Sequence, residues 1–156
     1  MKNTLYILIM TIAFVPQTYA EKIDIPLEDA WDAAIEVLLD MDAYPTLRDT
    51  ELRVIKTDPI SMKLDKTTAH CGKMLGIHYI RDKRTKTSVS YSLRFKEVSP
   101  DVTDIRVKVK IDGYFFKNET SWAVWVEKTR DADKVLQCKS TGELEKQFVQ
   151  NILNSV

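Results

Sequence analysis

The sequence predicts an α+β fold: a two-layer sandwich in which an N-terminal and a C-terminal helix pack on one face of a twisted antiparallel sheet of about 5–6 strands. Apolar residues recur at 3- and 4-residue spacing near both ends of the chain, and strictly alternating segments lie between them. The 156 residues contain no internal repeat, so residues 21–156 are expected to form a single domain. The 23 basic and 23 acidic residues cancel, which argues against a nucleic-acid-binding protein.

Residues 1–20 are typical of a cleaved signal peptide. Lys2 supplies the positive start, Leu5–Val15 is an apolar run, and Thr18 and Ala20 are small residues at positions −3 and −1 of a cleavage point. The alternative is a membrane anchor, but the run is shorter than the about 20 residues that span a bilayer. No cysteine follows the run, so we expect a periplasmic or secreted protein that is not a lipoprotein and has no transmembrane span after cleavage.

The first mature element is a helix over residues 27–41, and Pro26 suits its first turn. Its apolar face carries Leu27, Trp31, Ala34, Ile35, Leu38 and Met41, with Trp31 assigned to the core. Short strands are expected at 44–48, with Pro45 marking a sheet edge, and at 51–57. Residues 58–85 have little regular spacing and predict a loop that contains one short strand near 75–80.

The strongest strand patterns lie at 87–95 and 104–113, where apolar and polar residues alternate over four repeats. The turn residues Ser99-Pro100-Asp101 between them predict an antiparallel hairpin. Two further strands are expected at 121–128 and 134–138. A capping box at Ser140–Glu143 should then start a closing helix that ends near Asn154 and buries Leu144, Phe148 and Ile152.

The two cysteines, Cys71 and Cys138, are expected to form a structural disulfide, because an exported chain meets an oxidising compartment. The alternative is a pair of unpaired buried thiols. His70, Cys71 and His78 could be imagined as a metal site, but their spacing matches no common zinc pattern. We therefore expect no metal and no cofactor.

The candidate binding residues are cationic. Arg94, Arg106, Lys108 and Lys110 should share the open face of the predicted hairpin, where they could contact an acidic protein, an anionic lipid headgroup or a glycan. The alternative is a solvated strand face that resists edge aggregation. Trp122 and Trp125 have opposite parity on the strand at 121–128, so one of them, taken as Trp125, is a candidate exposed contact.

Catalytic residues are not predicted. The chain has no G-x-S-x-G elbow, no phosphate-binding glycine loop and no H-E-x-x-H motif. Its first-helix carboxylates, Asp29, Asp32, Glu36 and Asp40, are spaced as expected for the solvated side of that helix. The chain is therefore expected not to be an enzyme.

Four segments resemble small exported domains of bacterial envelope proteins: DAWDAAIEVL at 29–38, ELRVIKTDP at 51–59, Cys71-Gly72, and C-x-S-T-G-E-L-E at 138–145. Their order is similar to that of the helix-grip domains of BamC, the lipoprotein subunit of the outer-membrane β-barrel assembly machinery. The resemblance covers most of residues 23–153 and implies a helix-grip fold. The chain departs from that family in having no lipidated cysteine and one domain where the family has two. No functional residue is carried over, because none has a motif specific enough to transfer.

Together these patterns favour a non-enzymatic envelope protein that binds an envelope partner or assists an assembly. The alternative is a carrier of an apolar or lipid ligand, because a helix gripped by a curved sheet can enclose a cavity. The bulky residues Trp31, Ile35, Leu38, Phe95 and Phe148 argue that this space is filled.

Overall fold

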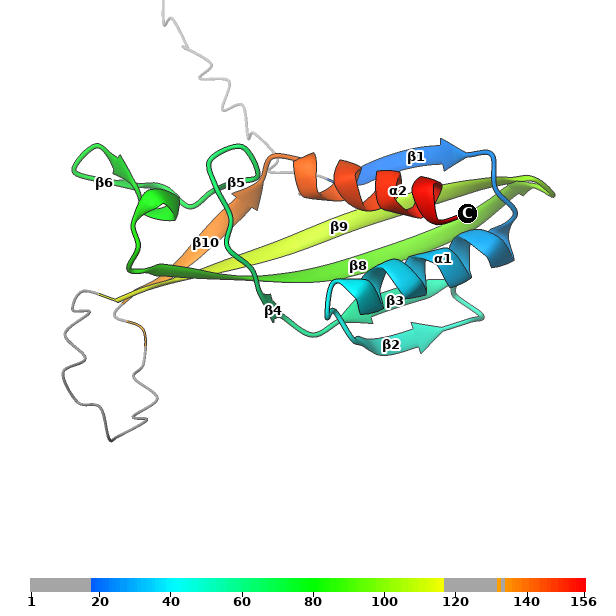
Figure 1. Ribbon diagram of the computed structural model, residues 1–156, viewed down its shortest axis with the longest axis horizontal. Coiled ribbons are helices and arrows are strands. Elements are labelled where there is room, and N and C mark those ends of the chain that lie inside the picture. The colour runs from blue at the N-terminus through cyan, green and yellow to red at the C-terminus, as the bar shows by residue number, and fades with distance from the viewer. Residues whose placement is uncertain (1–17, 117–131, 133) are drawn as a thin grey trace, which may run out of the picture.

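The computed structural model describes residues 18–116, 132 and 134–156 (Figure 1). In chain order the elements are β1 (Tyr19–Ile23), α1 (Leu27–Asp40), β2 (Pro45–Asp49), β3 (Val54–Thr57), β4 (Ile60–Ser61), β5 (Ala69–His70), β6 (Lys73–Met74), β7 (Ile77–His78), the 3₁₀ helix η1 (Tyr79–Arg81), β8 (Thr85–Ser99), β9 (Val102–Phe115), β10 (Lys134–Ser140) and α2 (Glu143–Ser155). The predicted α+β class, with a large antiparallel sheet and two helices, is confirmed.

The main sheet has eight strands among the described residues, so the prediction of 5–6 was too low. Its path is β2-β3-β8-β9-β10-β5, with β1 paired to β9 and β4 paired to β8, and β6 and β7 form a separate two-stranded ribbon. Three of its strands were not predicted: β1, β4 and β5. β4 and β5 are two residues long, too short to show an alternating pattern in the sequence, and β1 overlaps the end of the predicted signal peptide. The predicted strand at 121–128 lies outside the described residues.

The long β8–β9 hairpin organises the sheet. It confirms the predicted antiparallel pair and extends it to 15 and 14 residues, joined at the turn after Ser99. The other edge of β9 is shared by two strands: β10 pairs with its residues 111–115, and β1 pairs with its residues 103–107. One strand therefore contacts three others.

The strand β1 includes the end of the predicted signal peptide. Tyr19 lies opposite Val107, and Ala20 lies opposite Arg106. Cleavage after Ala20 would leave Glu21–Ile23 to pair with β9.

Both helices cover the same face of the sheet, as Figure 1 shows for α1 over β8 and α2 over β9. Alternate β8 and β9 residues point to this face and are buried. Phe95 meets Trp31 of α1 edge to face at 5.4 Å between ring centroids, and Tyr91 meets Phe148 of α2 at 5.3 Å. These large apolar contacts hold the two layers together, and no helix of the described residues covers the opposite face of the sheet.

The predicted first helix is confirmed within one residue, and the structure explains its end. Asp42 adopts a positive φ of 56° and donates its N–H to the Leu39 carbonyl at 3.0 Å. The Ala43 N–H reaches the Leu38 carbonyl at 2.8 Å. This is a Schellman motif, which satisfies the last carbonyls of the helix and turns the chain toward β2.

The predicted capping box at Ser140–Glu143 was wrong. Ser140 still belongs to β10, where it pairs with Ala69, so the helix cannot begin there. Gly142, with φ of 92°, is the N-cap of α2, and the Ser140 hydroxyl donates to Glu145 Oε2 at 2.6 Å. The helix nevertheless runs to Ser155 and buries Leu144, Phe148 and Ile152, as predicted.

Candidate functional site

The open face of the sheet carries the four predicted cations. Arg94 of β8 lies directly opposite Arg106 of β9, Lys108 lies opposite Ser92, and Lys110 lies opposite Ser90. All four cations are exposed, because they alternate with the residues buried beneath the helices. We call this surface, defined by Arg94, Arg106, Lys108 and Lys110 with the adjoining Lys56 of β3, the basic face.

Short serine side chains separate these cations. Ser88, Ser90 and Ser92 occupy the open-face positions of β8 before Arg94, and Lys56 lies opposite Ser92 on its other side. Serine side chains cannot shield their long neighbours, so the lysine ammonium groups remain accessible from solvent. A partner could approach them along the whole hairpin.

Two of the cations have acidic neighbours on their own strand. Arg106 forms an ion pair with Asp104 at 3.2 Å, and Lys110 forms one with Asp112 at 2.9 Å. The hydrogen bond and charge of Asp112 raise the pKa of Lys110. Each acid lies two residues from its cation, and residues two apart on a strand point to the same face. This spacing can be read from the sequence.

Arg94 and Lys108 differ from these two: neither forms an ion pair with any residue in the described part of the chain. Arg94 instead faces a second arginine across the hairpin. Like charges directly opposite each other in a sheet are destabilising. No ion pair within the described residues compensates this repulsion.

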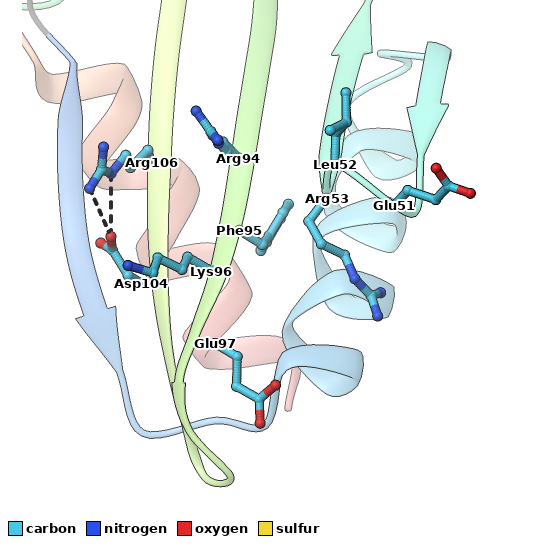
Figure 2. Close-up of a pocket in the computed structure, with 9 residues that line it drawn as sticks. All are labelled: Glu51, Leu52, Arg53, Arg94, Phe95, Lys96, Glu97, Asp104 and Arg106. Atoms are coloured by element: carbon cyan, nitrogen blue, oxygen red, sulfur yellow. Dashed lines mark hydrogen bonds and ion pairs between the residues drawn. The ribbon is translucent and has the colours of Figure 1, made fainter.

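A groove of about 490 Å³ lies beside Arg94, between the turn that precedes β3 and the part of β8 that continues toward the hairpin turn (Figure 2). Its lining carries both charges together with the apolar side chains of Leu52 and Phe95, and consists of Glu51, Leu52, Arg53, Arg94, Phe95, Lys96, Glu97, Asp104 and Arg106. A mixed-charge groove suits a polar peptide or charged side chains better than an apolar ligand.

Arg53 is turned away from the basic face. Its guanidinium pairs with Glu28 at the start of α1 at 2.7 Å and lies 5.9 Å from the ring centroid of Trp31. These contacts fix the β2–β3 turn against the helix layer. Arg53 thus has a partner in the helix layer, whereas the four predicted cations project from the other face of the sheet.

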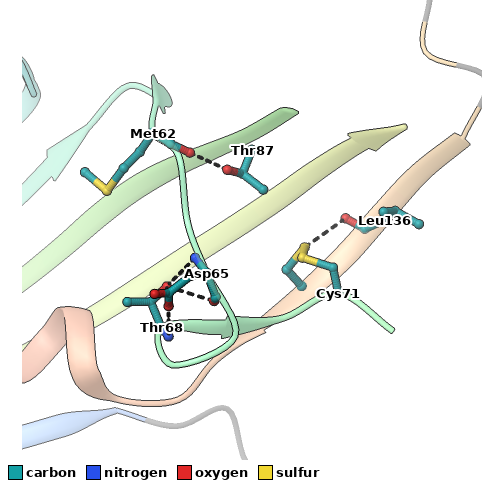
Figure 3. Close-up of a disulfide and its surroundings, with 7 residues drawn as sticks. Met62, Asp65, Thr68, Cys71, Thr87 and Leu136 are labelled. Carbon is teal, nitrogen blue, oxygen red and sulfur yellow. Dashed lines mark hydrogen bonds between the residues drawn. A yellow bond between two sulfur atoms is a disulfide. The ribbon is translucent and has the colours of Figure 1, made fainter. Parts of the chain in front are cut away.

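The predicted disulfide is present: Cys71 and Cys138 are joined at 2.01 Å between sulfurs (Figure 3). Cys71 follows β5 and is buried, and Cys138 lies in β10. The bridge secures the chain between β5 and β7 to the sheet. Because Cys71 is in the disulfide, it has no thiolate to offer to a metal site with His70 and His78. The described residues contain no group of three or more potential metal ligands.

The remaining candidates fall into two groups. Trp122 and Trp125 lie outside the described residues. Asp29, Asp32, Glu36 and Asp40 are exposed on α1, as expected. Within the described ranges, no helix is both long and apolar enough to cross a membrane.

Comparisons with known proteins add little. No family model matches the chain, and no curated protein matches it. One similar solved structure is a DUF4468 family protein from Bacteroides ovatus, at 10% identity and a TM-score of 0.35. The alignment covers 88% of this chain and 78% of that one.

Proposed function

We propose that this chain is an exported, non-enzymatic envelope protein that binds an acidic protein partner through its basic face and assists an assembly. One observation carries the proposal: Arg94 and Lys108 project from an uncovered sheet face without an acidic partner among the described residues, and Arg94 opposes another arginine. An acidic surface would relieve this repulsion and add charge-assisted hydrogen bonds.

Export is supported by two independent features. The disulfide between Cys71 and Cys138 persists only where thiols are oxidised, as in the periplasm or outside the cell. The pattern of residues 1–20 is that of a cleaved signal peptide.

The helix-grip arrangement and the resemblance to BamC belong to the same proposal. Two helices on one face of a long antiparallel hairpin support it. The carrier alternative receives less support, since Trp31, Leu38 and Phe148 are buried and occupy the space between the layers. A binding module that uses the opposite face needs no such cavity.

The test is site-specific cross-linking from the basic face. A photo-reactive amino acid replaces Ser92, between Arg94 and Ser90, in protein expressed in its own cells. We expect one cross-linked partner, and we expect the double variant Arg94→Glu/Lys108→Glu to abolish the cross-link without lowering its melting temperature, because a glutamate at position 94 would face Arg106. Charge reversal inverts the attraction, so the loss should be at least tenfold.

Lys146 provides the matched control, because it is exposed on α2 in the opposite layer. Lys146→Glu should leave the cross-link intact. If Lys146→Glu and Arg94→Glu/Lys108→Glu reduce the cross-link equally, the basic face is not the binding surface.

A further inference from the structure

The β6–β7 hairpin projects from the end of the sheet opposite the β8–β9 turn (Figure 1). Its tip is apolar and open to solvent: Leu75 is 97% exposed, Ile77 63% and Met74 37%. No other described large hydrophobic residue is as exposed as Leu75. Three adjacent apolar side chains at one projecting tip mark a contact surface.

The backbone of the tip disfavours leucine. Leu75 has φ of 49° and Gly76 has φ of 83°, the two positive values of a type I′ turn. Asn, Asp and Gly adopt this conformation readily, whereas a bulky side chain is strained there. Leu75 is therefore placed where it costs conformational energy and gains no burial within the described chain.

The hairpin has two chemically different faces. Met74 pairs with Ile77, and Lys73 pairs with His78, so the apolar pair and the polar pair point to opposite sides. Desolvation and the nearby charges of Lys73, Arg81, His70 and Lys66 lower the pKa of His78. Lys73 lies on the hairpin itself, Lys66 in the turn before β5, and Arg81 in η1 directly after β7.

No acid interrupts this cluster. Residues 66–81 contain neither aspartate nor glutamate, and the flanking acids are engaged elsewhere. Asp65 accepts hydrogen bonds from Thr67 and Thr68, and Asp82 pairs with Arg84 at 2.7 Å. The hairpin thus presents a positive rim around an apolar tip.

The base of the hairpin is fixed to the sheet. The disulfide holds Cys71 to β10, and the Tyr79 N–H donates to the Gly72 carbonyl at 3.1 Å. Tyr79 also packs edge to face on Phe115 at 5.2 Å. A contact made by the tip would not have to order the segment first.

We propose that the β6–β7 hairpin docks the protein on a bilayer surface that contains anionic phospholipids. Met74, Leu75 and Ile77 enter the boundary between headgroups and acyl chains, and Lys66, Lys73 and Arg81 contact the phosphates. Burial of apolar side chains and attraction between basic residues and anionic lipid are the two terms that drive interfacial binding. This surface is separate from the basic face, so the membrane-docking proposal can be overturned without affecting the proposed function, and the reverse.

The experiment is co-sedimentation of the protein, in the form its host produces, with lipid vesicles. The vesicles contain roughly 30% phosphatidylglycerol in phosphatidylcholine, which gives an anionic bilayer. Leu75→Asn is the decisive variant, because asparagine suits the positive φ and removes the apolar tip. We expect its partition coefficient to fall by about tenfold or more, since burying one leucine contributes that much. Its melting temperature should match or exceed that of the wild type.

Leu52→Asn is the matched control, since Leu52 is 66% exposed in the β2–β3 turn at the other end of the sheet. It should bind vesicles as the wild type does, and Lys73→Glu should bind several-fold less, with the deficit shrinking at high salt. The proposal is overturned if Leu75→Asn binds as tightly as Leu52→Asn, or if Lys73→Glu has no effect. Failure of all vesicle binding would also overturn it.

Discussion

Asp82 and Arg84 form a carboxylate–guanidinium pair at 2.7 Å that a backbone hydrogen bond reinforces. Arg84 donates from Nε to Asp82 Oδ1 at 3.0 Å, from Nη2 to Oδ2 at 2.7 Å, and from its backbone N–H to Oδ1 at 3.0 Å. These bonds favour the ionised carboxylate and lower the pKa of Asp82 to about 2. Arg84 also lies 4.9 Å from the ring centroid of Phe115, which links the pair to the core.

We expect Arg84→Lys to raise the pKa of Asp82 toward 3.8, because lysine cannot reproduce the bidentate fork. The backbone hydrogen bond remains, so the rise should be partial. Carbon-13 NMR titration of the side-chain carboxyl measures it. Asp65 is the internal control: hydrogen bonds from Thr67 lower its pKa, and the substitution should not move it.

The sign for stability follows from this lowered pKa. The Asp82 contribution is fully present above the unfolded value near 3.8 and is lost as pH falls through about 2. The stability difference between wild type and Arg84→Lys should therefore shrink between these two pH values. A difference that grows on acidification would contradict the assigned pairing.

At the scale of elements, the position of β10 depends on a missing side chain. Gly113 of β9 lies opposite Leu136, and a Cβ atom added there would stand 3.0 Å from Cys138 Sγ and 3.2 Å from Leu136 Cβ. Neither neighbour can rotate away, because one belongs to the disulfide and the other adjoins the backbone. Glycine is therefore required for the close approach of β10.

We expect Gly113→Ala to destabilise the fold by about 1–3 kcal/mol, as overpacking does in other cores. Urea unfolding at neutral pH measures the change. Introduced into the Cys71→Ala/Cys138→Ala background, the same substitution should cost less, because the nearest sulfur is gone. If Gly113→Ala lowers the free energy of unfolding equally with and without the disulfide, the clash is with Leu136 alone.

The sequence predicted elements where a long pattern repeats and failed where structure depends on contacts between distant residues. Period-two alternation located β8 and β9, and with them the shared face of Arg94, Arg106, Lys108 and Lys110. The two-residue strands β4 and β5 exist only because partner strands reach them. The capping box failed for the same reason, since pairing with β5 holds Ser140 in its strand.

The β6–β7 tip was missed because Leu75-Gly76 is not a usual type I′ sequence. One local signal was present: Lys-Met-Leu-Gly-Ile-His places apolar residues on both sides of a glycine within a segment free of acids. Burial and exposure of such a short segment depend on the whole fold, so the sequence alone could not distinguish a surface tip from a core strand.

For the whole molecule, the disulfide should set much of the stability. Cys71 and Cys138 are 67 residues apart, and a cross-link of this span restricts the unfolded chain by about 4 kcal/mol. We expect Cys71→Ser/Cys138→Ser to lower the free energy of unfolding by up to that amount. Urea unfolding compares the free energy of unfolding of this variant with that of the oxidised wild type. The reduced wild type, which lacks the bond but keeps both cysteines, separates the loss of the disulfide from any effect of the serine side chains. An unchanged midpoint would show that the unfolded chain is already compact.

The shared edge of β9 has a consequence for the order of folding. β8 and β9 are separated by a two-residue turn, so their loop closes at little entropic cost and their pairing can form early. Among the described residues β1 pairs with β9 alone, and β10 pairs with β9 over five positions but with β5 over only two, so both strands depend mainly on β9. Cys138 lies on β10, so we expect oxidation of Cys71 and Cys138 to follow the assembly of the sheet and to lock a topology that strand pairing has already selected.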